Sequence, residues 1–138
     1  MIGLIVGALA VWATTDLGLD KGAGESSYAP TPAPKAPRVV RTTPAQGATI
    51  APGPFLLGVT FDQPMEKGNY SFVQISADTF PDCDHQATQS ADGRTYTMRC
   101  TPKPGRHYEV WFNNPPYMNF KARSGPPAQP YQLLFRAR

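Results

Sequence analysis

The segment FLLGVTF at residues 55–61 alternates between two kinds of position. Phe55, Leu57, Val59 and Phe61 are two residues apart, and side chains at that spacing in an extended chain point to the same side. The alternation predicts a half-buried β-strand whose four odd-numbered side chains enter a hydrophobic core.

Outward from this segment, apolar residues recur in short alternating runs that are bounded by Pro, Gly, Asn and Asp. Sixteen prolines and twelve glycines make up more than a fifth of the 138 residues, which disfavours long helices. No segment supports a helix of useful length. We therefore expect an all-β fold, with further strands at Val39–Thr43, Tyr70–Ile75, Arg94–Cys100, His107–Phe112 and Tyr131–Arg136.

Turn residues agree with these boundaries. Asp92-Gly93 is a strong hairpin dipeptide because its backbone tolerates positive φ, so Gln86–Ala91 and Arg94–Cys100 are expected to be the arms of a hairpin. Pro104-Gly105 followed by Tyr108 is typical of a tyrosine corner, in which the hydroxyl bonds to upstream backbone. In the next strand Tyr108 points inward, while Trp111 points the other way and covers the second face or an edge.

The first part of the chain predicts export. Residues 1–15 carry no charged side chain and reach about 22 Å as a helix, short of the ~30 Å hydrocarbon core. We interpret residues 1–19 as an export signal, cleaved after Ala13, or as an uncleaved N-terminal anchor that tethers the protein to a membrane through residues 1–15. Residues 20–37 are rich in Pro, Ala and Gly and predict a disordered linker, whose removal up to Pro37 leaves the domain at residues 38–138 folded.

The charge pattern gives no sign of nucleic-acid binding. The net charge is +3, and the 13 basic residues are scattered singly instead of forming a stripe along which a phosphate backbone could bind.

Four short motifs occur in order along residues 38–138. They are a Pro-x-x-Gly-Ala turn at 44–48, TFDQPM at 60–65, KPGRHY at 103–108 and YQLLF at 131–135. In their order and spacing they resemble the bacterial Ig-like domains of the SbsA/Big_5 type over about three quarters of the chain. The resemblance implies an immunoglobulin-like antiparallel β-sandwich of about seven strands that serves as an accessory, spacer or adhesion module and has no catalytic residues.

Cys83 and Cys100 are the two cysteines, 17 positions apart. An even number of cysteines in an exported chain favours a disulfide, and two free or metal-binding thiols are the alternative. Neither cysteine is placed for the inter-sheet bridge of antibody domains.

Asp82, Cys83, Asp84 and His85 are all chemically competent metal ligands, and His107 or Cys100 would have to complete such a site. Neighbouring residues on an extended chain alternate in direction, so at most two of the four converge. We interpret the cluster as a solvated acidic loop and expect no metal or other cofactor. No Gly-x-Ser-x-Gly elbow occurs either, so we do not expect an enzyme.

Residues 111–120, WFNNPPYMNF, combine aromatic rings, amides and prolines in one strand-to-loop stretch. That mixture suits stacking sites for sugars or proline-rich peptides. The candidate binding surface consists of Trp111, Asn113, Asn114, Tyr117 and Phe120. The alternative is that Trp111, Phe112 and Phe120 are core or strand cover, with prolines that only shape a long loop.

Together these features predict a non-catalytic, extracytoplasmic Ig-like module that acts as a protein-interaction or envelope-structural element, whether periplasmic, secreted or envelope-anchored. Its partner would be another envelope or secreted protein. The alternative is a periplasmic carrier of a small ligand or of copper. A pocket lined by Trp111, Tyr117 and Phe120 would favour the carrier, and an exposed sheet edge would favour a protein partner.

Overall fold

A computed structural model describes residues 33–138 of the protein. The predicted export segment at residues 1–19 and the linker up to residue 32 lie outside the described residues. Within residues 33–138 no helix is long and apolar enough to cross a membrane.

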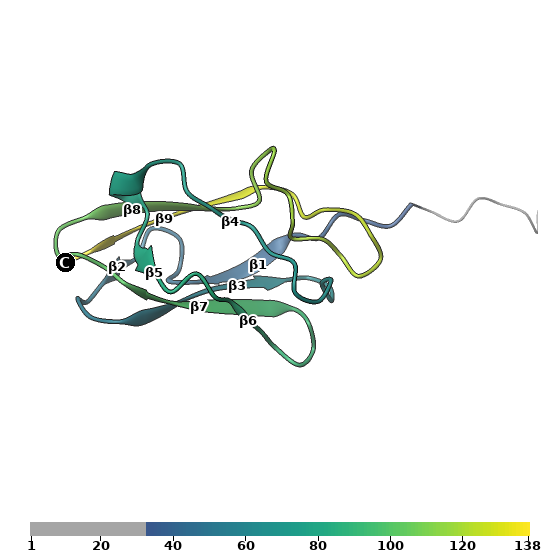
Figure 1. Ribbon diagram of the computed structural model, residues 1–138, viewed down its shortest axis with the longest axis horizontal. Helices are drawn as coiled ribbons and strands as arrows, with labels where there is room; N and C mark the ends of the chain where they lie inside the picture. Colours follow the sequence, from purple (N-terminus) through teal and green to yellow (C-terminus); the bar gives the residue numbers. More distant parts are fainter. Residues whose placement is uncertain (1–32) are drawn as a thin grey trace, which may run out of the picture. The chain divides into compact units, whose positions relative to one another are not determined.

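The regular secondary structure of residues 33–138 is almost entirely β-strand, and the strands form two stacked sheets (Figure 1). The strands are β1 (Val39–Thr43), β2 (Thr49–Ile50), β3 (Phe55–Phe61), β4 (Phe72–Val73), β5 (Asp82–Cys83), β6 (Thr88–Gln89), β7 (Thr95–Thr101), β8 (His107–Phe112) and β9 (Tyr131–Ala137). A 3₁₀ turn, η2 (Ala77–Thr79), follows β4. The expected all-β fold is confirmed.

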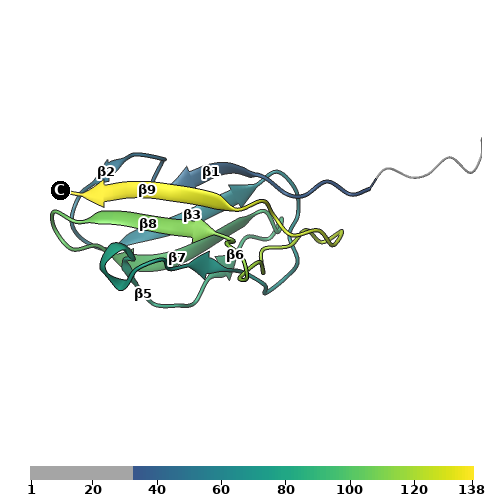
Figure 2. The ribbon, with the colours of Figure 1, turned by 90° about the horizontal axis from the view of Figure 1, so that it is seen from above.

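One sheet has the order β1-β3-β7-β5, with β6 also paired to β7, and the other has the order β2-β9-β8-β4 (Figure 2). All pairs are antiparallel except β2 with β9. Between β1 and β2 the chain passes from the first sheet to the second. Strand β1 therefore forms one edge of the first sheet, and β2 forms one edge of the second. The opposite edges are β4 in one sheet and β5 with β6 in the other.

The core lies between the sheets and follows the alternation of the sequence. Leu57, Val59 and Phe61 of β3 are buried and Phe55 is half-buried, whereas Leu56 between them is 51% exposed. Strands β1, β3 and β8 occupy the predicted residues. Strand β7 is shifted by one residue at both ends, and β9 extends one residue beyond the predicted end. Periodicity was sufficient for β3, β7, β8 and β9 because each of them has one face in the core and one toward solvent.

The predicted strand at Tyr70–Ile75 is wrong in length, because only Phe72 and Val73 pair with β8. Beyond Val73 the chain leaves β8 for the 3₁₀ turn, and Ile75 is 53% exposed. The two-residue strand β2 was not expected. It contains too few residues for an alternation to be recognised, and it is held by pairing with the distant strand β9.

The predicted hairpin arm at Gln86–Ala91 forms only at β6, where Thr88 pairs with Thr97. Cys83 pairs with Cys100, so four residues, 84–87, lie opposite two, 98–99. This bulge bends the strand and ends the pairing of the arm. His85 within it has φ = 62°, a conformation that is uncommon for residues other than glycine.

A disulfide joins Cys83 to Cys100 across this broken hairpin. The two residues face each other on β5 and β7, with a Cα–Cα distance of 4.0 Å, and both side chains are buried. The bridge therefore lies within one sheet and ties the two-residue edge strand β5 to the long strand β7.

The tyrosine corner is present at the start of β8. The backbone N–H of Lys103 donates to the Tyr108 hydroxyl at 2.6 Å, and the ring of Tyr108 stacks on Phe135 with a centroid distance of 5.3 Å. This contact fixes the turn that precedes β8 against the C-terminal strand.

The sequence predicts that the domain begins at Arg38, but the folded unit begins earlier. The compact unit spans Pro34–Arg138, and Pro37 is among the fully buried side chains. Gln129 N–H donates to the Pro37 carbonyl at 3.1 Å, and the Gln63 amide donates to the Lys35 carbonyl at 3.0 Å. The last residues of the predicted linker thus pack on the sandwich.

A chain that starts at Arg38 is therefore expected to be less stable than one that starts at Ala33. The loss should be about 2 kcal/mol of unfolding free energy, from the buried proline ring and two hydrogen bonds. Urea unfolding of the two chains measures it. Equal midpoints would show that residues 33–37 contribute nothing to the fold.

Candidate functional site

The segment at 111–120 leaves β8 and turns back over one end of the sandwich. Asn114 and Tyr117 close a tight turn through two backbone hydrogen bonds of 2.9 and 2.7 Å, and the Pro115–Pro116 peptide bond between them is cis. The turn places Asn114 half-buried and Tyr117 in solvent. The structure separates the five candidate surface residues into two groups.

Asn113 is fully buried, so its assignment to the binding surface is wrong. Its amide nitrogen donates to the carbonyls of Phe120 and Ala128, both at 2.9 Å, and its amide oxygen accepts from Phe120 N–H at 2.9 Å. Its φ of 64° lies in the left-handed region, which Asn tolerates better than most residues. Asn113 joins two loops and is not available to a ligand.

Phe120 is also fully buried, so its assignment to the binding surface is wrong as well. Its ring lies 4.9 Å from Tyr96, 5.1 Å from Phe61 and 5.3 Å from Phe72, measured between centroids. An aromatic side chain that closes the end of a sandwich gains more from burial than it would on the surface. Phe120 is part of the core.

Trp111 is half-buried on the outer face of the β2-β9-β8-β4 sheet, as the alternation in β8 predicts. Its Nε1 donates to the Glu109 carboxylate at 2.8 Å, and the Gln132 amide donates to the same oxygen at 2.7 Å. Val73 is the residue directly opposite Trp111 on the neighbouring strand β4. This arrangement covers the outer face of the sheet.

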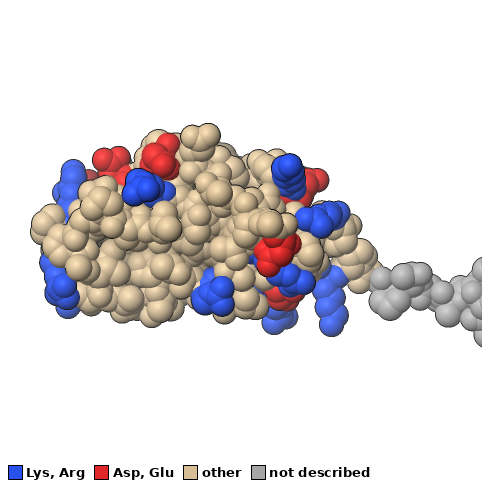
Figure 3. Space-filling model, turned by 90° about the horizontal axis from the view of Figure 1, so that it is seen from below, with Lys and Arg blue, Asp and Glu red and all other residues tan. Residues whose placement is uncertain are grey.

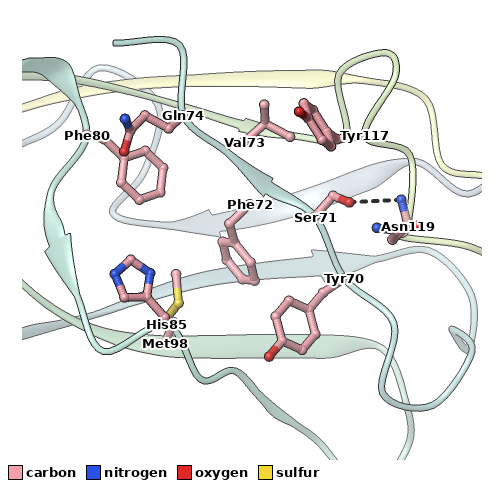
Figure 4. A pocket seen from close by; sticks show the side chains of 10 residues that line it. All are labelled: Tyr70, Ser71, Phe72, Val73, Gln74, Phe80, His85, Met98, Tyr117 and Asn119. Atoms are coloured by element: carbon pink, nitrogen blue, oxygen red, sulfur yellow. Dashed lines mark hydrogen bonds between the residues drawn. The ribbon is translucent and has the colours of Figure 1, made fainter. Parts of the chain in front are cut away.

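Tyr117 is 60% exposed and stands at the mouth of a pocket of about 480 Å³ (Figure 4). The pocket lies on the open side of the sandwich, between the edge strand β4 and the bulge that follows β5. Residues from separate segments of the chain line it: Tyr70, Ser71, Phe72, Val73, Gln74, Phe80, His85, Met98, Tyr117 and Asn119. Of the predicted surface residues, Tyr117 alone is among them.

The edge of the pocket is held by Ser71. Its hydroxyl accepts from the backbone N–H of Asn119 at 3.0 Å, and its carbonyl accepts from Asn113 N–H at 3.1 Å. These bonds fasten the aromatic loop to the start of β4. No sequence pattern predicts Tyr70, His85 or Met98 as neighbours of Tyr117, because the fold alone brings them together.

Strand β4 has one free edge. Since the Ser71 carbonyl accepts from Asn113 and antiparallel pairs alternate, the N–H and C=O of Phe72 point away from β8. Neither group has a partner among residues 33–138. A free edge beside an apolar pocket is the arrangement to which extended peptides add as a further strand.

The remaining polar groups of the core have structural partners. The Tyr96 hydroxyl donates to the Glu66 carbonyl at 2.8 Å, and burial, with a smaller effect of the Glu66 charge, raises the pKa of Tyr96 to about 12. At the hairpin turn, hydrogen bonds from Ser90 and Arg94 lower the pKa of Asp92. Both groups keep one protonation state at neutral pH.

The disulfide removes the thiolates of Cys83 and Cys100 from the set of possible metal ligands. In the part of the chain that the structure describes, no three His, Cys, Asp or Glu side chains are grouped so as to hold a metal ion.

The two sheets define the class of the protein. With β1, β3, β7 and β5 in one sheet and β4, β8 and β9 in the other, the strands have the arrangement of an immunoglobulin-like sandwich, completed by the tyrosine corner. Residues 33–136 match the family model described as bacterial Ig-like domain, Big_5, and the chain belongs to this family. No curated protein matches the chain. Domains of this family are generally non-enzymatic and typically extracellular or at the cell surface. The disulfide is consistent with such a location.

Proposed function

We propose that this protein is a non-catalytic interaction module that works outside the cytoplasm, in the periplasm, in the envelope or after secretion, and binds another envelope or secreted protein. The observation that carries the proposal is the position of Tyr117. An exposed aromatic side chain stands beside an apolar pocket and an unpaired strand edge. Aromatic anchors in such settings contribute much of the free energy of protein association.

A small-ligand carrier is the second candidate. The pocket volume of about 480 Å³ falls in the range of small-molecule sites. The pocket is not the one that the sequence suggested for a carrier, because Trp111 and Phe120 do not line it. The free edge of β4 supports a protein partner over a small ligand.

Tyr117→Ala is expected to weaken binding to the partner about thirtyfold, or ~2 kcal/mol, as truncation of an aromatic anchor commonly does. Its effect on the free energy of unfolding should be within about 0.5 kcal/mol, because the side chain is mainly in solvent. The measurement is the affinity of a partner isolated from envelope extract, at equal folded concentration.

Leu56→Ala is the matched control. Leu56 is 51% exposed, similar to Tyr117, but lies on the outer face of the β1-β3-β7-β5 sheet. Figure 3 shows this face, on which most of the charged side chains lie toward the two ends. If Leu56→Ala weakens binding and Tyr117→Ala does not, the interaction surface is this sheet and not the pocket.

A further inference from the structure

We propose that the open side of the sandwich binds an extended peptide segment of the partner protein, with an apolar side chain at one position and a carboxylate four residues away. The inference rests on the proposed function as a protein-interaction module and adds the chemistry of the partner.

The pocket beside Tyr117 continues into a second one. This second pocket has a volume of about 250 Å³ and shares Gln74, Phe80 and His85 with the first. Its other lining residues are Ala77, Pro81, Asp82, Cys83, Lys103, Arg106 and Tyr108. The two pockets therefore form one groove that runs along β4 toward the start of β8.

The two ends of the groove differ in chemistry. None of the ten residues drawn in Figure 4 is Asp, Glu, Lys or Arg, and Phe72, Phe80 and Met98 supply apolar surface. The far end holds Lys103 and Arg106, both exposed, against a single lining carboxylate, Asp82. Arg106 Nη1 donates to the backbone carbonyl of Asp78 at 3.2 Å, which keeps the guanidinium at this end. An excess of one positive charge complements a partner carboxylate.

The spacing of the ends follows from strand β8. Phe112 lies opposite Phe72 at the apolar pocket, and Tyr108, four residues earlier, lines the charged one. Four residues of strand span about 13 Å, and residues four apart in an extended peptide point to the same side. One peptide strand can thus place an apolar side chain in one pocket and a carboxylate in the other.

The backbone of such a peptide also has a partner. The free N–H and C=O of Phe72, which lines the first pocket, offer one pair of strand hydrogen bonds to a peptide that lies along β4. Main-chain bonds of this kind supply affinity in strand addition, while the pockets select the side chains.

The experiment is a selection of displayed random decapeptides on the full chain, followed by affinity measurements on a synthetic peptide of the selected sequence. We expect sequences with an aromatic or large aliphatic residue four positions from Asp or Glu, and loss of binding to Tyr117→Ala. Selection of no peptide, or of peptides without the acidic residue at this spacing, would overturn the inference.

Charge variants give effects of opposite sign. Arg106→Glu should lower the affinity for the selected peptide at least tenfold, and Asp82→Asn should raise it. Arg99→Glu, on the outer face of β7, should leave the affinity unchanged. Replacing the peptide carboxylate by Lys should reverse the preference between wild type and Arg106→Glu. Lys103→Glu provides the same test if Arg106→Glu does not fold. Equal affinities for all variants contradict a carboxylate at this end.

Two further readouts separate this inference from the proposed function. Slower amide exchange at Phe72 in the peptide complex supports strand addition, and unchanged exchange contradicts it. If the natural partner depends on Tyr117 but not on Arg106 or Asp82, the interaction module stands and the peptide chemistry is wrong. If binding does not depend on Tyr117, both proposals fail.

Discussion

Asn113→Ala should lower the free energy of unfolding by about 3–5 kcal/mol, although the residue lies at the start of a surface loop. The change removes two donors and one acceptor and leaves the Phe120 and Ala128 carbonyls buried without these partners. Each buried polar group left without a partner costs about 1–3 kcal/mol. It also places Ala at a φ of 64°.

Urea unfolding measures this effect, and two variants separate its causes. Asn113→Gly keeps the backbone conformation and loses only the amide, so it should recover the part of the loss that is due to φ. Asn114→Ala, at the neighbouring half-buried position, should cost less than about 1 kcal/mol. Similar losses for Asn113→Ala and Asn114→Ala would show that the buried amide network does not stabilise the fold.

Removal of the disulfide by Cys83→Ala with Cys100→Ala should cost about 3 kcal/mol. The bridge closes a loop with a sequence separation of 17, and the stabilisation expected from such a cross-link is of this size. Without it, the short edge strand β5 keeps only its two-residue pairing with β7.

Unfolding with and without reductant provides the measurement. Reductant should destabilise the wild type to the level of the double variant and leave the double variant unchanged. Thiol titration of the unfolded, non-reduced protein should find no free thiol. Two titratable thiols, or a wild type insensitive to reductant, would contradict the cross-link.

The alternation of core and solvent positions predicted the long strands β3, β7, β8 and β9. Strand β3 is the clearest example, with Leu56 in solvent between buried neighbours. Strands β2 and β5 have two residues each and exist because distant strands pair with them. A local sequence pattern does not indicate which distant strand will pair with it. For this reason β2 and β5 were not predicted.

Only part of the candidate site was predicted, for a related reason. Aromatic rings and amides in a loop have the same sequence signature whether they close a core or contact a partner. Tyr117 extends from the turn into solvent, while Phe120, three residues later, lies among Phe61, Phe72 and Tyr96. The groove is formed by β4, the bulge after β5 and the start of β8. Only the fold brings these three segments close together.

Photo-crosslinking in the native cell tests the central claim, that this domain binds a protein through the pocket beside Tyr117. A photoreactive phenylalanine analogue replaces Tyr117 in one chain and Leu56 in another, two positions of similar exposure on different sides of the sandwich. The account predicts a discrete crosslinked protein from position 117 and none from position 56. A crosslink from position 56 with none from position 117 would contradict it.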